Sequence, residues 1–359
     1  MKLLLLPGDG IGPEIAACVE QVLEALARRH QVDIDLSRRP VGLEALASDS
    51  VTVSETTFAE AAGVDGVILG PVSTADYPPV AEGGLNPSAE FRRRFDLYAN
   101  IRPSRTRPGV PALASFMDLV IVRENTEGFY ADRTMHQGSG EFMPTPDLAL
   151  AIRKITRQGS ERIGRAAAGL AAGRRRKLTI VTKSNVLKMS DGLFRNAAQS
   201  AARDEADVEI EEVLVDAMAS LLVREPERFD VIVTSNMFGD ILSNQAAELA
   251  GGLGVAGSLN AGDACGIAQA AHGSAPDIAG RGQANPSALV LSTAMLIGWL
   301  AQRNGDDGAM AAAHALERAV DIALGAADGR TVDLGGSAST TEAAKAIIRA
   351  LDLAPVGVG

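Results

Sequence analysis

Three arginines stand in compact sequence contexts that favour recognition of a small anion. Arg92 and Arg102 lie in "FRRRFDLYANIRP", and Arg123 lies in "VIVRENTEGFY". Each guanidinium is a planar, permanently charged fork that matches a carboxylate. Three such groups converging on one pocket would suit a dicarboxylate or a tricarboxylate. We assign the neighbouring Arg93 and Arg94 to surface ion pairs.

Carboxylate and amide side chains offer a metal site further along the chain. Asp216 ends the apolar run "VEIEEVLVD", and Asp240 opens the helical pattern "GDILSNQAAEL". Asn244 follows Asp240 at i+4, which places both side chains on one face of a helix. Oxygen ligands without histidine or cysteine favour Mg²⁺ or Mn²⁺. On spacing alone, Asp240 is equally well explained as a charge at a helix N-terminus.

Proton transfer would need titratable groups near these arginines and carboxylates. Lys183 follows a predicted strand in "VTKSN", and Tyr130 lies seven residues after Arg123. Both types of side chain can hold or move a proton in an active site. We therefore treat Lys183 and Tyr130 as candidate proton-transfer residues.

The glycine cluster Gly8-x-Gly10-x-Gly12 is similar to a dinucleotide-binding loop, but its spacing differs. The Rossmann fingerprint is G-x-G-x-x-G between a strand and a helix. Here the third glycine comes one residue early, and Pro13 occupies the position where it should stand. We predict a tight turn that leads into a helix with Pro13 at its start and Glu14 in its first turn. The amide groups of that helix start could still receive an anion.

Short apolar runs alternate with helical periodicity along the chain, which predicts an α/β fold. Asn285 before Pro286 is a helix N-cap signal, and Ser339 with Glu342 forms a capping box. Strands are predicted at 2–6, 32–36, 66–69, 119–122, 178–182, 208–215 and 230–234. Helices are predicted at 13–28, 145–171, 240–249, 286–301, 310–325 and 340–350.

Length and composition limit the classes of function. A chain of 359 residues suits about two domains, and a net charge of −11 argues against nucleic acid or an anionic membrane as a partner. Cys18 and Cys265 lack metal-ligand spacing, so we expect buried free thiols in a reducing compartment. No apolar run is long enough to span a bilayer. We expect a cytoplasmic protein.

Six segments match one known family in the same order along the chain. Together they resemble the β-decarboxylating dehydrogenases that act on 3-isopropylmalate, isocitrate, homoisocitrate, tartrate and D-malate. Each segment is a weak signal by itself, whereas the ordered set is specific and runs nearly end to end. The segments are "GDGIGPE" at 8–14, "DLYANIRP" at 96–103, "VRENTEGFY" at 122–130, "TKSN" at 182–185, "RFDVIVTSNMFGDILSN" at 228–244, and "HGSAPDIAG" with "ANP" at 272–286.

The resemblance implies a two-domain α/β/α fold that is not a Rossmann fold. Residues 1–98 would pair with 252–359 as the cofactor-side domain, and 99–251 would form the substrate, metal and dimerisation domain. An arm around 131–146 would clasp a second copy, which implies a homodimer with shared active sites. The residues implied for NAD binding are Ile11, His272, Gly273, Ser274, Ala275, Asp277 and Asn285.

The resemblance also implies a reaction on a malate derivative whose carboxylates bind Arg92, Arg102 and Arg123. Mg²⁺ or Mn²⁺ would be held mainly by Asp240 and by Asp216 of the partner subunit, with Asn244 beside them. Lys183, also from the partner, would take the proton of the C2 hydroxyl while C2 gives a hydride to the nicotinamide. After the β-carboxylate leaves as CO₂, Tyr130 would protonate C3.

Asp277 indicates NAD rather than NADP. An acidic residue at this place in the family accepts hydrogen bonds from the adenosine ribose, and it would repel a 2′-phosphate. Two departures from the family pattern remove a negative charge each: Asn244 replaces a second aspartate, and Gln269 replaces a glutamate. They leave open a regulatory subunit without catalysis, although the arginines, Tyr130, Lys183, Asp216 and Asp240 are all present and favour an active enzyme.

The residues before Arg92 predict which malate is the substrate. Isopropylmalate members place leucines four and three positions before this arginine, where this chain has Ser88 and Ala89. Isocitrate members place serine six before and asparagine four before, and this chain has Asn86 and Ser88, the same groups in swapped order. A hydroxyl and an amide lose affinity for an apolar substituent. We predict a polar or absent C3 substituent: isocitrate first, then D-malate or tartrate, then 3-isopropylmalate.

Overall fold

One large mixed sheet runs through the molecule. The computed structural model describes residues 1–130, 135, 140–205 and 207–353. Ten strands form this sheet in the order β2-β1-β3-β12-β11-β4-β5-β10-β8-β9, and β6 with β7 forms a separate hairpin. The strands are β1 Lys2–Leu6, β2 Asp35–Arg38, β3 Gly66–Leu69, β4 Ala99–Arg105, β5 Asp118–Glu124, β6 Glu141–Thr145, β7 Leu148–Ala151, β8 Lys177–Thr182, β9 Glu209–Leu214, β10 Val231–Thr234, β11 Leu259–Ala261 and β12 Gly266–Gln269.

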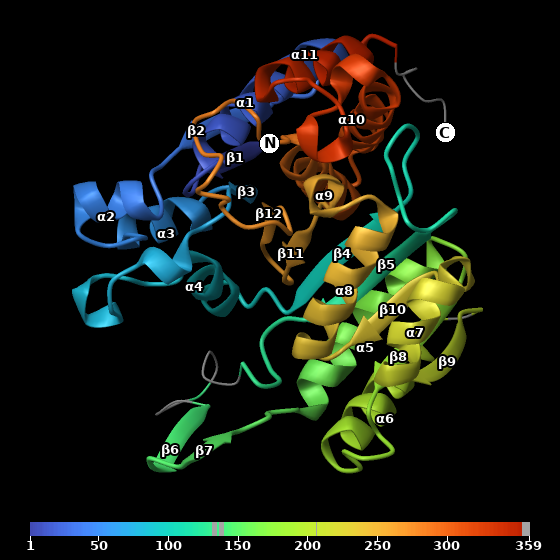
Figure 1. The fold of residues 1–359 in the computed structure, drawn as a ribbon. Helices are drawn as coiled ribbons and strands as arrows, with labels where there is room; N and C mark the ends of the chain where they lie inside the picture. The colour runs from blue at the N-terminus through green and yellow to red at the C-terminus, as the bar shows by residue number, and fades with distance from the viewer. Residues whose placement is uncertain (131–134, 136–139, 206, 354–359) are drawn as a thin grey trace.

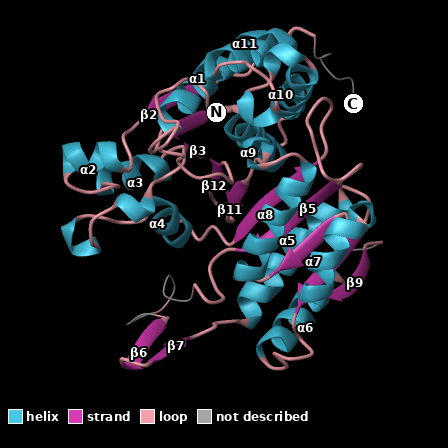
Figure 2. Cartoon of the chain, in the orientation of Figure 1, coloured by secondary structure: helices cyan, strands magenta, loops and turns pink. Residues whose placement is uncertain are grey.

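Eleven α-helices, counted over the described residues, flank this sheet (Figure 2). The predicted α/β class is therefore confirmed. The helices are α1 Gly12–His30, α2 Leu43–Asp49, α3 Glu55–Ala62, α4 Pro87–Arg94, α5 Arg157–Ala172, α6 Ser190–Ala202, α7 Val215–Arg224, α8 Asn236–Ala250, α9 Ser287–Asn304, α10 Asp307–Gly325 and α11 Thr340–Leu351.

The hydrophobic core is divided between two lobes, an upper and a lower one in Figure 1. Two clusters draw nearly all their residues from before residue 98 and after residue 252, and the larger one combines residues of α1, α9, α10 and α11 with residues of β1 and β3. Two other clusters draw theirs from 99–250, around β5, β8 and β10. This distribution is consistent with the predicted domain division, which stays a prediction. Strands β4 and β11, paired antiparallel, join the two halves of the sheet.

The glycine cluster forms a tight turn between β1 and α1. Gly8 and Gly10 have φ values of 78° and 58°, in the left-handed region that favours glycine. A Cβ atom on Gly10 would lie 2.0 Å from the carbonyl oxygen of Ser274, so the turn packs directly on that loop. The backbone N–H of Ile11 donates to the same oxygen at 2.8 Å. Pro13 and Glu14 lie in the first turn of α1, as predicted.

The helix predicted at 145–171 is wrong in its first part. Thr145 ends β6, Leu148–Ala151 forms β7, and α5 begins only at Arg157. The side chain of Thr156 accepts a hydrogen bond from the backbone N–H of Gly159, which fixes this helix start. Every residue of the β6–β7 hairpin is exposed, and the hairpin extends away from the rest of the molecule (Figure 1). Most of the predicted arm before residue 140 lies outside the described residues.

Several local predictions can be compared directly with the structure. The strands at 2–6 and 66–69 and the capping box of Ser339 and Glu342 are confirmed. Strand β2 begins at Asp35 rather than at residue 32. Cys18 and Cys265 are buried free thiols, and burial raises the pKa of each to about 11. Over the described residues, no helix is both long and apolar enough to cross a membrane.

Candidate active site

Arg102 and Arg123 meet at Asp240. Strands β4 and β5 run antiparallel and carry the two arginines, and α8 carries Asp240. Both arginines donate through Nη1 to the same oxygen, Oδ1 of Asp240, at distances of 3.2 Å and 2.5 Å. Because α8 begins at Asn236, Asp240 lies in the second turn and not at the helix start as predicted. Its partners are therefore the arginines rather than the first amides of the helix.

Each of the two guanidinium groups is also held by neutral oxygens. Arg102 donates to Ser243 Oγ at 2.9 Å and to Asn244 Oδ1 at 3.3 Å. Burial lowers the pKa of Arg102, while the charge of Asp240 acts in the opposite direction. Arg123 donates through Nε and Nη2 to Asn236 Oδ1. Two buried cations are thus fixed in place beside one another, a geometry that suits the carboxylates of a small acid.

The second oxygen of Asp240 is available to a metal ion. The side chain of Asp240 is 34% exposed, and among the described residues its Oδ2 accepts no hydrogen bond. Asn244 lies one turn further along the same face of α8. Both side chains can therefore offer oxygen ligands to a metal ion, the type of ligand that Mg²⁺ and Mn²⁺ prefer. Over the described residues, no three His, Cys, Asp or Glu side chains gather closely enough to hold a metal ion.

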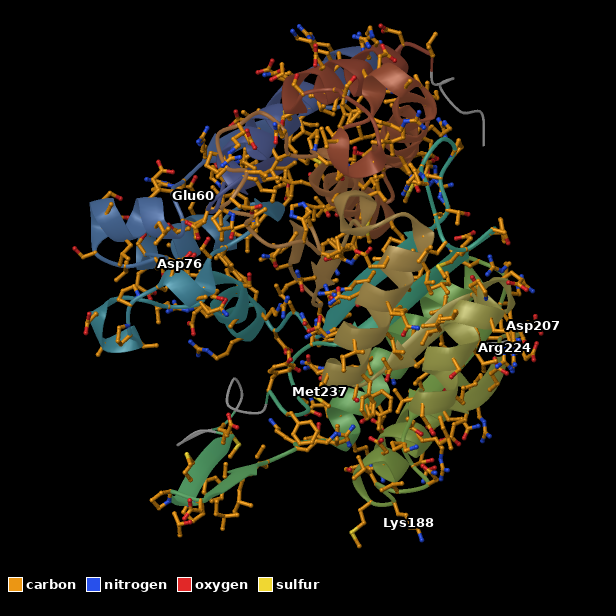
Figure 3. The ribbon with its side chains drawn as sticks, viewed as in Figure 1. Glu60, Asp76, Lys188, Asp207, Arg224 and Met237 are labelled. Carbon is orange, nitrogen blue, oxygen red and sulfur yellow. The ribbon has the colours of Figure 1, made fainter. Side chains whose placement is uncertain are left out.

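Lys183 and Asp216 form a separate pair. Lys183 Nζ donates to Asp216 Oδ1 at 2.7 Å, and this hydrogen bond lowers the pKa of the Asp216 carboxyl. Asp216 lies in the first turn of α7, whereas the sequence predicted it at a strand end. Lys188, five residues after Lys183, lies at the lower edge of the molecule in Figure 3. Met237, in the first turn of the helix that carries Asp240, lies near the centre of the figure. Tyr130 lies in the turn after Gly128, partly exposed.

The predicted substrate residues Asn86, Ser88 and Arg92 share one short helix, α4, which the sequence analysis did not predict. Asn86 is its N-cap, with Oδ1 accepting from the backbone N–H of Ala89 at 3.1 Å. Ser88 accepts a hydrogen bond from Gln269, at the end of β12. Ser88 and Arg92 are four residues apart and so lie on one face of α4. The two neighbours of Arg92 make the predicted surface ion pairs, with Glu90 and Glu55.

The predicted cofactor residues line or border one cavity of about 320 Å³. Ile11, His272 and Asn285 line it, and Ser274 is tied to it through its contact with Ile11. Asp277 is exposed and makes no hydrogen bond to any described residue. Gly273 and Ala275 lie in the same loop, Ala275 with a φ of 39°. Other residues that line the cavity were not predicted from the sequence, among them Gly254, Ile278, Val332 and Asp333.

His272 lines this cavity with a ring that has one unpaired nitrogen. Its Nδ1 lies 3.0 Å from the carbonyl oxygen of Gly273, which requires that this nitrogen carry the proton. Burial lowers the pKa of His272, so the ring is neutral near pH 7 and Nε2 keeps its lone pair. Nε2 is buried and has no partner among the described residues.

Comparison with known proteins agrees with this arrangement. Residues 2–347 match the family described as isocitrate/isopropylmalate dehydrogenase. The chain belongs to that family. It is 40% identical over 351 residues to the isocitrate/homoisocitrate dehydrogenase of Thermus thermophilus, covering 98% of each chain. It is 37% identical over 337 residues to the 3-isopropylmalate dehydrogenase of Saccharolobus solfataricus, covering 94% of this chain and 95% of that one.

A solved structure extends the likeness to the fold. The isocitrate dehydrogenase from Methylococcus capsulatus superposes with a TM-score of 0.85 at 36% identity, covering 98% of this chain and 99% of that chain. This isocitrate/isopropylmalate dehydrogenase family member is therefore a decarboxylating dehydrogenase. The glycine turn at 8–12 accordingly belongs to a fold that is not a Rossmann fold, as the spacing predicts.

Proposed function

We propose that the enzyme oxidises and decarboxylates an (R)-malate-type 2-hydroxy acid whose C3 carries a polar substituent or none. Isocitrate is the first candidate, followed by D-malate or tartrate and then 3-isopropylmalate. The observation that carries the proposal is the meeting of Arg102 and Arg123 at Asp240, beside Asn244. It supplies fixed cations for two carboxylates and an open carboxylate oxygen for a divalent ion.

In this proposal the chain's own residues bind the acid and move its protons. Arg92, Arg102 and Arg123 hold the malate carboxylates. Lys183 of the partner subunit takes the proton of the C2 hydroxyl, and Tyr130 delivers a proton to C3 after CO₂ leaves. Asp240 and Asp216 of the partner subunit hold Mg²⁺ or Mn²⁺. When bound, the nicotinamide supplies a hydride acceptor and the divalent ion supplies a Lewis acid.

The cofactor in this proposal is NAD. The cavity beside Ile11 and His272 has an apolar wall, which fits an adenine. Asp277 stands exposed nearby with both carboxylate oxygens available to the ribose hydroxyls. The same carboxylate would repel the 2′-phosphate of NADP.

We also propose a homodimer with shared active sites, which the separation of Lys183 and Asp216 from Asp240 within one chain supports. In the single chain these two residues pair with each other and make no contact with Asp240. The exposed β6–β7 hairpin carries Phe142, Met143, Leu148 and Leu150, whose apolar side chains are 43–63% exposed. A second copy would cover such a surface. We propose that this hairpin is the described part of the dimer-clasping arm.

A substrate panel tests the proposal. Isocitrate, homoisocitrate, D-malate, tartrate and 3-isopropylmalate are assayed by formation of reduced nicotinamide with NAD⁺ and Mg²⁺. The expected result is the highest kcat/KM with isocitrate, and CO₂ released in equal amount to the reduced nicotinamide. The highest kcat/KM with 3-isopropylmalate would overturn the preference for a polar pocket. Failure to oxidise any of these acids would point instead to a regulatory subunit.

A further inference from the structure

Arg153 and Asp191 form a buried ion pair between the end of the β6–β7 hairpin and the start of α6. Arg153 Nη2 lies 2.6 Å from Asp191 Oδ1, and the two side chains are 8% and 1% exposed. Arg153 also donates through Nη1 to Ser190 Oγ at 2.9 Å and through Nη2 to Ser235 Oγ at 3.1 Å. A planar guanidinium bound to three separate side chains is held in one orientation.

The main chain beside Arg153 is also fixed. The N–H of Lys154 donates to the Gly128 carbonyl at 3.0 Å, and the Lys154 carbonyl accepts from the Gly128 N–H at 2.8 Å. The guanidinium carbon of Arg153 lies 5.9 Å from the centre of the Phe129 ring and 5.5 Å from that of Phe238. At these distances an aromatic face attracts a cation. The guanidinium is therefore supported by its own segment and by two aromatic rings.

The carboxylate of Asp191 ties the Lys183 segment to this fixed cation. Its Oδ2 accepts the main-chain N–H of Lys183 at 2.6 Å, and Arg153 occupies Oδ1, so both oxygens are used. The segment between β8 and α6 is otherwise largely exposed, with Val186 at 64% and Met189 at 91%. Asp191 is thus a buried anchor for a segment that has few interior contacts of its own.

This anchor bears on where the Lys183 side chain can reach. Lys183 Nζ donates to Asp216 Oδ1, and the side chain is 26% exposed. A lysine stem is flexible, so the position of its nitrogen depends on how firmly the main chain beneath it is held. The contact of Asp191 is with the main chain and does not depend on what Nζ binds. It therefore remains in place when Nζ turns from Asp216 toward a substrate.

We infer that Arg153 and Asp191 are positioning residues that hold Lys183 where it can accept a proton. This inference rests on the proposed function, in which Lys183 takes the proton of the C2 hydroxyl at the active site it shares with the partner subunit. Arg153 acts through Asp191, and Asp191 acts through the main chain of Lys183. A displacement of about 1 Å at a reacting group can lower a rate by about a hundredfold. The contacts that bind the substrate would stay as they are.

The test compares the wild type with Arg153→Gln, Arg153→Lys and Asp191→Asn. The substrate is isocitrate, or whichever acid of the panel above the wild type oxidises fastest. Asp191→Asn replaces one of the two acceptor oxygens with an N–H donor, so one of its two contacts is lost. Arg153→Lys keeps the positive charge but loses the planar fork, so it carries the test if loss of the charge prevents folding. Arg157→Gln, an exposed change four residues away, is the matched control.

Arg153→Gln and Asp191→Asn should lower kcat by about ten- to hundredfold. KM should stay within about threefold, because the groups that bind the substrate are unchanged. Arg153→Lys should fall between these variants and the wild type, and the control should match the wild type. Hydrogen exchange measured by mass spectrometry should become faster in residues 183–190, while β8 and β10 keep their protection.

A kcat of Asp191→Asn within about twofold of the wild type would overturn the inference, because Lys183 would then not need this support. Faster exchange in β8 and β10 as well would show that the pair stabilises the whole domain, and unchanged exchange in residues 183–190 would show that the pair does not hold them. Either result would also overturn the inference.

Lys183→Ala separates this inference from the proposed function. A loss of turnover in Lys183→Ala without a loss in Asp191→Asn would overturn the inference and leave the proposed function standing. Wild-type turnover in Lys183→Ala would overturn the proposed proton transfer and the inference together. A wild-type enzyme that oxidises none of the acids would do the same.

Discussion

Arg123 Nη1 and Asp240 Oδ1 lie 2.5 Å apart, and Arg102 donates to the same oxygen. One aspartate thus offsets part of the positive charge of two arginines whose side chains are almost fully buried. Removing its charge takes away an anion that both guanidinium groups share, and it also removes the carboxylate proposed to bind the divalent ion. These two consequences can be measured separately.

We expect Asp240→Ala to abolish turnover and to lower the free energy of unfolding by about 1–3 kcal/mol, since Asp240 is partly exposed. Asp240→Asn keeps the side-chain shape, so it should lose turnover with a smaller loss of stability. Activity assays and urea unfolding measure the two effects. Glu248→Gln, an exposed change on the same helix, is the matched control. Near wild-type turnover of Asp240→Asn at saturating Mg²⁺ would exclude Asp240 as a metal ligand.

Asn244→Asp should tighten apparent Mg²⁺ binding by about threefold or more, because a carboxylate is a better ligand for a hard cation than an amide oxygen. Arg102 already donates to the amide oxygen at 3.3 Å and can pair with the new charge. The measurement is a titration of activity against Mg²⁺. Asn304→Asp, at the exposed end of α9, controls for the change in net charge. An unchanged midpoint would place residue 244 outside the metal's surroundings.

Asp277→Asn should lower kcat/KM for NAD⁺ by about tenfold, since a neutral amide is a weaker acceptor for ribose hydroxyls than a carboxylate. It should also reduce the discrimination against NADP⁺, because the charge that repels a 2′-phosphate is gone. Initial rates with both cofactors at equal concentration measure the ratio. Asp49→Asn at the exposed end of α2 is the control. A wild-type rate with NADP⁺ equal to that with NAD⁺ would contradict the cofactor assignment.

Asp9→Asn tests how the loops on the cofactor side are held together. Asp9 is buried and accepts from the backbone N–H groups of Leu43 and Ser73 and from the Tyr77 hydroxyl. Ser73 in turn donates to Ser274 in the cofactor loop. An amide would set N–H against N–H, so we expect a loss of about 1–3 kcal/mol of stability and a raised KM for NAD⁺. Asp35→Asn at the exposed start of β2 is the control, and an unchanged KM would show that these loops are independent.

Local chemistry explains which parts of the fold could be predicted. The run of leucines that forms β1 and the capping box at Ser339 each depend on only a few neighbouring residues of the sequence. Both were predicted with correct bounds. The glycine turn was also readable, since its spacing excludes the Rossmann loop. The Asn86-Pro87 signal at the start of α4 was equally local and was overlooked.

Other features depend on contacts between distant segments. β4 contains two arginines and a proline in "ANIRPSR", so no alternation of apolar residues marks it as a strand. The segment forms a strand because its backbone pairs with β11 on one side and with β5 on the other. Asp333 lines the cofactor cavity, and its carboxylate accepts a hydrogen bond from Asn285, 48 residues earlier. Strand β7 begins at Leu148, which is followed by Ile152 and Ile155 at helical spacing, and this explains the wrong helix prediction.

The buried imidazole of His272 should make stability depend on pH. Burial lowers its pKa, outweighing the Gly273 carbonyl and the charge of Asp333, which act in the opposite direction. In the unfolded chain its pKa is about 6.5. Between that value and the lower folded value the unfolded state binds more protons, so stability falls as the pH decreases through this window. The pKa of His30 is lowered too, and its contribution has the same sign.

Urea unfolding at about pH 7.5 and about pH 5.5, on either side of the usual histidine pKa, measures this loss. His272→Gln cannot take up the proton, so its free energy of unfolding should fall less between the two values than that of the wild type. His30→Gln should remove only the share that belongs to His30. His314→Gln, an exposed change on α10, is the matched control for the substitution. If His272→Gln lost as much stability as the wild type between the two pH values, protonation of the buried His272 ring would not account for the loss.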